Sequence, residues 1–175
     1  LLAFAAEKCA ELGLPIQIIL APRHAKEELP IRQIQLRSFL ERLSLPVLEV
    51  DDINACGVLS NQFPAGRQSL ALCFGPAWIF HEEVLRHFGA GMLNVHPLPL
   101  PRYLGGAHFT WQILNYDKTY GIGIQEITSV IDRGDILRFE EGVLPSTVRI
   151  PMDYFQQLYL VAQEFLAKFL DDLIR

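Results

Sequence analysis

Two polar side chains near the middle of the chain have the chemistry and the spacing of a functional site. Asn94 and His96 close a short apolar stretch that begins at Met92, with one residue between them. Because side chains alternate along a β-strand, both are expected to point to the same face. An imidazole exchanges protons near neutral pH, so the pair is capable of catalysis. We interpret it as one edge of a site.

The loop after His96 favours the same interpretation. Pro97, Pro99 and Pro101 prevent the strand from continuing and stiffen the chain. Ligands of open α/β sheets bind at the carboxyl ends of strands, where both polar side chains are expected. The alternative is structural, because a single histidine after a strand commonly has one backbone partner and a single asparagine commonly occupies a turn. Taken one at a time, the residues leave both interpretations open.

Strand-like and helix-like segments alternate along most of the chain. Short apolar runs bounded by proline or glycine indicate buried strands, and apolar residues three or four positions apart indicate helices. This alternation predicts an α/β fold, a Rossmann-like open and mostly parallel sheet with helices on both faces. The expected strands are 16–21, 47–50, 70–74 and 92–96, the expected helices are 2–12, 36–43 and 80–88, and a loop is expected at 22–30.

The C-terminal part is expected to differ. Residues 120–139 predict a strand, a loop at Asp132–Asp135 and a further strand. Pro151 opens a long helix that is expected to end near 174, with one apolar stripe that packs on the core. The stripe consists of Phe155, Leu158, Tyr159, Ala162, Phe165, Leu166, Phe169, Leu170 and Leu173.

The length of 175 residues predicts a single domain over 1–175. Open α/β domains normally begin with a strand, whereas this sequence begins with helix-like residues and has no initiator Met. We therefore expect the first strand and its turn to lie upstream, in a longer chain.

Charge and composition narrow the class of partner. The 15 Lys and Arg and the 20 Asp and Glu give a net charge of −5. This charge argues against binding of a nucleic-acid phosphate backbone, but it does not exclude tRNA. The scattered Cys9, Cys56 and Cys73 predict no disulfide framework and no metal site, and they indicate a cytoplasmic protein. No apolar run has the length of a membrane span. Neither a dinucleotide fingerprint nor a P-loop is present.

Three short motifs follow one another in the second half of the chain, and Asp132 lies 38 positions after Asn94. Together they resemble the signature of the formyltransferases that use 10-formyltetrahydrofolate. These include glycinamide ribonucleotide, methionyl-tRNA and sugar N-formyltransferases. The matching residues are Asn94, His96, Pro97, Leu100, Pro101, Tyr103 and Gly105, then Ile113–Asp117, then Ile131–Ile136.

The resemblance implies that Asn94, His96 and Asp132 are catalytic and that no metal takes part. Asn94 would donate a hydrogen bond to the oxyanion that forms when an amine attacks the formyl carbon. His96 would either stabilise that oxyanion or handle the amine's proton, and Asp132 would hold His96 in its productive protonation state.

The resemblance also implies a pocket for the folate. Ala77, Trp78, Ile79 and Phe80 would cradle the pterin ring, and Ile127, Thr128 and Ile131 would belong to the opposite wall. Core packing is the alternative for Trp78 and Phe80.

Departures from the family pattern concern the acceptor. Leu98 and Leu104 stand where related enzymes commonly have Ser and Arg, and 106–111 also differs from the tRNA enzymes. We expect a small-molecule or carrier-bound amine as acceptor. Methionyl-tRNA, hydrolysis of formyl-folate, and a non-catalytic folate-binding module of a larger protein are the alternatives.

Overall fold

A computed structural model describes residues 1–29, 32–55, 57, 59–60, 63, 68–103 and 109–173. The chain forms two compact units, Leu1–Gly57 with Leu166–Arg175, and Val58–Phe165. The site residues predicted above all belong to the second unit. Whether the whole chain acts as one domain stays a prediction.

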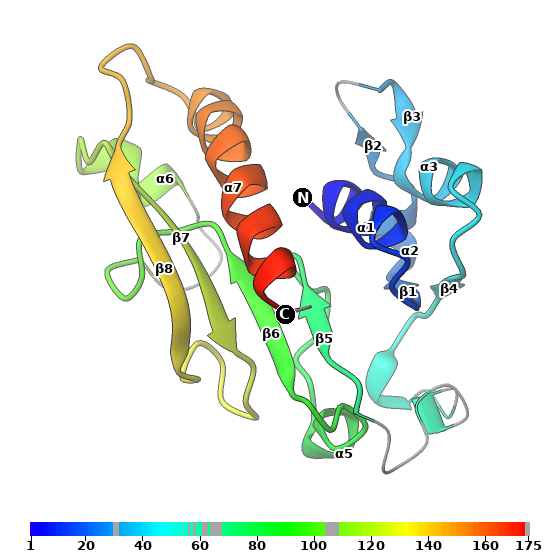
Figure 1. Cartoon of the computed structure of the whole chain (residues 1–175). Coiled ribbons are helices and arrows are strands. Elements are labelled where there is room, and N and C mark those ends of the chain that lie inside the picture. The colour runs from blue at the N-terminus through cyan, green and yellow to red at the C-terminus, as the bar shows by residue number, and fades with distance from the viewer. Residues whose placement is uncertain are drawn as a thin grey trace. The chain divides into compact units, whose positions relative to one another are not determined.

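The first unit packs short helices around a small apolar core that contains Leu20, Phe39 and Leu40 (Figure 1). Two of its strands pair in parallel and two in antiparallel fashion. Gly13 ends the first helix in the left-handed conformation, with a φ of 65°. The elements are α1 (Leu2–Glu11), β1 (Ile18–Leu20), α2 (Pro22–Ala25), β2 (Glu28–Leu29), β3 (Ile34–Gln35), α3 (Leu36–Arg42), β4 (Val47–Glu49) and the 3-10 helix η1 (Ile53–Ala55).

The predicted loop at 22–30 is wrong in part, because α2 and β2 lie within it. Proline is tolerated in the first turn of a helix, where its missing N–H would have no partner, so Pro22 starts a helix instead of preventing one. The predicted helix at 2–12, the helix at 36–43 and the strands at 16–21 and 47–50 are confirmed to within a few residues.

The second unit is built on a four-stranded sheet in the order β5-β6-β7-β8 (Figure 1). The first two strands are parallel, and the other two neighbouring pairs are antiparallel. This confirms the α/β class and the strand, loop and strand expected at 120–139. The bounds are β5 (Ala71–Cys73), α5 (Glu82–Leu85), β6 (Met92–His96), α6 (Phe109–Leu114), β7 (Thr119–Glu126), β8 (Ile136–Val143) and α7 (Pro151–Leu173).

Two helices of the second unit differ from expectation. The helix expected at 80–88 covers only Glu82–Leu85, and α6 was not expected. In α7 the predicted stripe is buried at Leu158, Ala162, Phe165, Leu166 and Leu170, but Phe155 and Leu173 are 52% and 49% exposed. Tyr154 takes the inward position instead, because its ring packs with Leu144 and Val148.

Helix α7 covers one face of this sheet, and Asn94 and His96 lie on the opposite face. Directly opposed residues of paired strands point to the same face. Arg138 lies opposite Ile124, and its guanidinium sits 5.5 Å from the centre of the Phe165 ring in α7. The helix therefore covers the face that carries the fully buried Ile122 and Ile124. Asn94 and His96, which alternate with Val95, belong to the opposite face.

Candidate functional site

Asn94 and His96 lie side by side at the carboxyl end of β6. The Nδ2 atom of Asn94 is 3.3 Å from Nδ1 of His96, which confirms that the two side chains share a face. His96 is 7% exposed, and the Oδ1 atom of Asn94 is buried without a hydrogen-bond partner among the described residues. Buried polar atoms are rarely left without a partner, so an unsatisfied amide oxygen beside an imidazole marks a place for a ligand.

The proline-rich loop covers part of the same face. Gly121 points to that face of β7, and a Cβ at this position would overlap the backbone of Pro99. Glycine is therefore required in the strand so that the loop can pack directly on it. Leu98 and Leu100 are also buried, at 1% and 5% exposure. The loop that follows His96 is thus held against the sheet.

The loop between β7 and β8, which carries Asp132, folds back towards Asn94. Gln125 lies directly opposite Asn94 in the antiparallel pair, so its side chain points to the same face. Its Nε2 atom donates a 3.0 Å hydrogen bond to the carbonyl of Gly134. Asp132 is two residues before Gly134, is partly buried, and has a φ of 54°. The sheet thus brings the loop of Asp132 to the face of Asn94 and His96.

The segment predicted to cradle the pterin starts at the same edge of the sheet. Because β5 and β6 are parallel, with Cys73 opposite Asn94, the chain after β5 leaves the sheet beside the two polar residues. It turns at Gly75, whose φ is 58°. Ile79 is 60% exposed, whereas Phe80 is buried at 6% and packs as a core residue.

The residues predicted for the opposite wall occupy the β7–β8 loop. Thr128 closes a tight turn, in which its Oγ1 accepts the N–H of Val130 at 3.3 Å and donates to the carbonyl of Val130 at 3.0 Å. Val130 and Ile131 are about 60% exposed, and Ile127 is partly buried. These exposed aliphatic side chains give the tightly folded loop an apolar surface.

Cys73 is the nearest thiol to the polar pair in the strand register. Burial raises the pKa of Cys73 to about 12. The thiol is therefore neutral at physiological pH and is not a nucleophile, because nucleophilic attack requires the thiolate. Cys73 packs as a small apolar residue, as the sequence indicates, and so does the buried Cys9.

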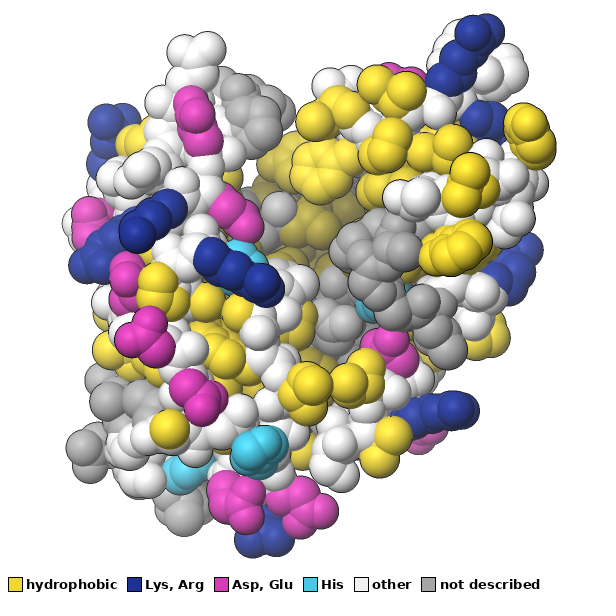
Figure 2. Space-filling view, turned by 180° about the vertical axis from the view of Figure 1, so that it is seen from behind, with side chains coloured by type: hydrophobic (Ala, Val, Ile, Leu, Met, Phe, Trp, Pro, Cys, Tyr) yellow, Lys and Arg dark blue, Asp and Glu magenta, His cyan; other side chains and the backbone are white. Residues whose placement is uncertain are grey.

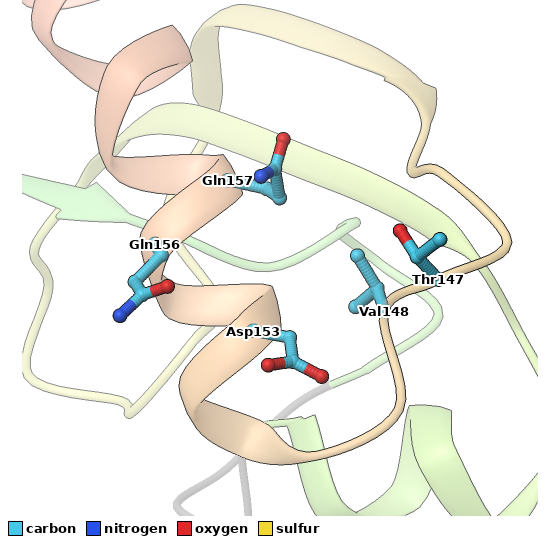
Figure 3. Close-up of a pocket in the computed structure, with 5 residues that line it drawn as sticks. All are labelled: Thr147, Val148, Asp153, Gln156 and Gln157. Atoms are coloured by element: carbon cyan, nitrogen blue, oxygen red, sulfur yellow. The ribbon is translucent and has the colours of Figure 1, made fainter.

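A separate cavity of about 220 Å³ lies at the start of α7 (Figure 3). Asp153 accepts the backbone N–H groups of Arg149 and Ile150 at 2.7 and 3.1 Å, and these hydrogen bonds lower its pKa. Its carboxylate therefore caps the helix, and none of the predicted site residues reaches this cavity. The lining residues are Thr147, Val148, Asp153, Gln156 and Gln157.

Within the described part of the chain, every helix is too short or too polar to cross a bilayer. The same residues include no group of three or more His, Cys, Asp or Glu side chains arranged to hold a metal ion.

Sequence reasoning missed Gln125. The available signal was that Gly121, Gly123 and Gln125 lie two positions apart and so share one face of the strand. Two glycines and one long amide on the same face indicate that other segments of the chain pack closely on it. Gly134 was recognised only as part of a motif.

The fold is of the α/β class, with the candidate residues Asn94 and His96 at the carboxyl end of β6, which is parallel to β5. Comparison with known proteins gives the family. Residues 67–145 match the model of the family described as "Formyl transferase", so this segment of the chain belongs to that family.

Individual relatives agree with this assignment. The chain is 31% identical over 129 residues to a methionyl-tRNA formyltransferase of Borrelia duttonii, covering 74% of this chain and 39% of the relative. It is 30% identical over 136 residues to the human mitochondrial methionyl-tRNA formyltransferase, covering 77% of this chain and 31% of that protein. The chain thus spans about a third of the length of these relatives.

Solved structures show the same fold at low sequence identity. The sugar 3N-formyl transferase WlaRD, crystallised in the presence of dTDP and 5-N-formyl-THF, superimposes with a TM-score of 0.76 at 15% identity, over 98% of this chain and 58% of that one. The phosphoribosylglycinamide formyltransferase of Bacillus halodurans superimposes with a TM-score of 0.71 at 17% identity, over 96% of this chain and 89% of that one.

Proposed function

We propose that the protein is an N-formyltransferase that moves a formyl group from 10-formyltetrahydrofolate to an amine, with Asn94, His96 and Asp132 as its catalytic residues. One observation carries the proposal. A buried amide with an unsatisfied oxygen lies beside an imidazole, on the sheet face to which the loop of Asp132 folds back.

The residues present fit a formyl-folate. The Oδ1 atom of Asn94 is an acceptor without a partner among the described residues, which is what the N–H group of an attacking amine requires. The co-substrate supplies an activated formyl group on N10. The neutral amide of Asn94 donates a hydrogen bond to the formyl oxygen, where negative charge develops as the amine attacks.

His96 and Asp132 provide proton transfer in this proposal. His96 lies beside Asn94, with its Nδ1 atom 3.3 Å from Nδ2 of the amide. The imidazole would take the proton that the attacking amine loses and pass it to N10 of the leaving tetrahydrofolate. Asp132 stabilises the protonated ring by its charge, which favours the form that the reaction generates.

The apolar loops on either side of the pair would hold the heterocycle. We propose that Ala77, Trp78 and the exposed Ile79 form one wall. Ile127, Thr128 and the exposed Ile131 belong to the other. Phe80 supports the first wall from the core.

The acceptor is an amine of a small molecule or carrier, or methionyl-tRNA. Relatives above 30% identity that act on methionyl-tRNA favour the second possibility. The net charge of −5 and the mixing of basic with acidic side chains on the face shown in Figure 2 favour the first. The free thiols of Cys9 and Cys73 support a reducing compartment such as the cytoplasm.

The test separates binding from turnover. Asn94→Ala and Asp132→Asn are expected to lower formyl transfer at least about 100-fold, the order lost with one oxyanion donor, while the Kd for a formyl-folate analogue stays within a few fold. Asp171→Asn, which changes a partly exposed aspartate of the first unit that pairs with Lys8 at 3.7 Å, is the matched control. Assays contain methionyl-tRNA or nucleotide-linked amino sugars as acceptors.

Each alternative gives a different result. Formyl-folate consumed at the same rate with or without an amine would establish a hydrolase. Folate bound by the wild type but never consumed would establish a binding module and overturn the proposal.

A further inference from the structure

Gln125 is a buried polar side chain that the proposed mechanism does not use. It is 4% exposed and is the next-to-last residue of β7 (Thr119–Glu126), which is an inner strand of the sheet. Burying an amide without compensation costs free energy, so a buried glutamine at the centre of a sheet needs a function that an aliphatic residue cannot perform.

The amide of Gln125 joins β7 to the loop that carries Asp132. Its Nε2 donates to the Gly134 carbonyl at 3.0 Å across nine positions of sequence. The backbone N–H of Glu126 donates to the carbonyl of Asp135 at 2.9 Å, so two successive residues of β7 hold two successive residues of the loop. The loop therefore returns to the sheet at a fixed point.

The backbone on both sides of Asp132 is restrained. On one side, Thr128 and Val130 form a tight turn. On the other side, Gly134 approaches the strand so closely that a Cβ would overlap the carbonyl of Glu126. Asp132 itself adopts a left-handed conformation, which aspartate tolerates better than most residues do. Small displacements of Gly134 would thus move the Asp132 carboxylate.

We propose that Gln125 is a positioning residue, which clamps Gly134 to the sheet and thereby holds Asp132 at the working distance from His96. It is not proposed to touch substrate. The inference rests on the proposed function, in which Asp132 acts through His96.

The chemistry of the contact specifies glutamine. Asparagine is one methylene shorter and would not reach the Gly134 carbonyl from the same backbone position. Glutamate would present a carboxylate oxygen to the carbonyl oxygen and remove the donor. Leucine fills a similar volume and leaves the carbonyl without its partner.

Gln112 provides a matched control in the same unit. It is 0% exposed, and its Nε2 also donates to a backbone carbonyl, that of Thr119 at the opposite end of β7. Its removal should destabilise the fold by a comparable amount without touching the loop of Asp132.

The experiment compares Gln125→Leu, Gln125→Glu and Gln112→Leu in the full chain. For both Gln125 variants we expect kcat to fall about 10- to 100-fold, the cost of misplacing a catalytic group by about 1 Å, while the Kd for a formyl-folate analogue changes less than about 3-fold. Gln112→Leu should lower the Tm by a similar amount and leave kcat within about 2-fold of the wild type. Hydrogen exchange at 127–135 should accelerate in the Gln125 variants only.

Two results would overturn the proposal. One is a folded Gln125→Leu protein with wild-type kcat, and the other is a Gln112→Leu protein that loses as much kcat as Gln125→Leu. Faster exchange at 127–135 in a protein whose wild type transfers no formyl group would support the clamp and refute the proposed function, so the two failures are distinguishable.

Discussion

The two ends of β7 are held by different sets of hydrogen bonds. At the Thr119 end, Asp117 accepts the hydroxyl of Tyr103 at 2.9 Å and the N–H of Thr119 at 2.8 Å, and its own carbonyl accepts the hydroxyl of Tyr154 at 2.8 Å. At the Glu126 end, the loop of Asp132 is held by the side-chain hydrogen bond from Gln125 to Gly134 and by backbone hydrogen bonds from Glu126 to Asp135 and from Ile127 to Met92.

This difference predicts which substitutions should lower the free energy of unfolding and which should lower the formyl-transfer activity. The Asp117 network joins a loop, a strand and a helix through several contacts, so losing one contact lowers the free energy of unfolding and leaves the site in place. The hydrogen bonds at the other end hold the loop that carries Asp132, a proposed catalytic residue. Losing one of these should cost activity more than stability.

Gly134→Ala should have the largest effect. The added Cβ would overlap the carbonyl of Glu126, so the loop must move away from the strand. The backbone of Glu126 cannot move aside as a flexible side chain could, so the loop and Asp132 with it would be displaced. We therefore expect kcat to fall about 100-fold or more. Steady-state kinetics and circular dichroism, measured together, separate lost activity from lost folding.

Gly57→Ala is the control for that substitution. A Cβ at Gly57 meets no atom of the described residues within 4 Å, so the same chemical change should leave kcat unaltered. Wild-type activity in a folded Gly134→Ala protein would show that the loop is not tightly placed, and the contrast between the two ends of β7 would be lost.

Asp117→Ala should mainly reduce stability. It removes two acceptors, one for a hydroxyl and one for a backbone N–H, and hydrogen bonds to a charged group contribute about 2 kcal/mol each. Asp117 is partly exposed, so water can replace part of the stabilisation that these hydrogen bonds provide. We therefore expect the free energy of unfolding in urea to fall by about 2 kcal/mol and kcat to stay within about 3-fold of the wild type. A larger loss of kcat than of stability would contradict the contrast.

The same carboxylate predicts a pH dependence of folding. Burial alone would raise the pKa of Asp117, but hydrogen bonds from Thr119 and Tyr103, together with the charge of Arg102, outweigh it and lower the pKa. Because the folded-state pKa lies below the usual 3.8, the stabilisation is present above that pH and is lost as the pH falls further. The stability difference between wild type and Asp117→Asn should therefore shrink below about pH 3.8, as measured by urea unfolding across pH.

Much of the framework could be predicted from sequence, for physical reasons. The predicted strand at Met92–His96 has the observed bounds, because the proline that follows His96 cannot continue the strand and so fixes its end. The helix that begins at Pro151 has a strong periodic pattern, although the inward position fell on Tyr154, whose hydroxyl finds a partner only in the folded state.

The contacts that place the Asp132 loop could not be predicted in the same way. The hydrogen bond from Gln125 to Gly134 depends on strand register and on a bulge between Ile124 and Gln125. The pattern of residue types in the sequence gives neither the strand register nor the position of the bulge. The need for glycine at 121 and 134 likewise arises from close approach of other segments.

Tyr103→Phe should have the smallest effect, and it tests the redundancy directly. The variant keeps the ring and removes one hydroxyl from the Asp117 network, so its cost should be about 1 kcal/mol or less, because the partly exposed carboxylate can bind water instead. Tyr154→Phe is the matched comparison, since that hydroxyl donates to the Asp117 carbonyl from a fully buried position and should cost more. Urea unfolding of both variants gives the order. Because Tyr103 lies on the loop that follows His96, a loss of kcat greater than about 10-fold in Tyr103→Phe alone would mean that the Asp117 network positions the site and that both ends of β7 serve catalysis.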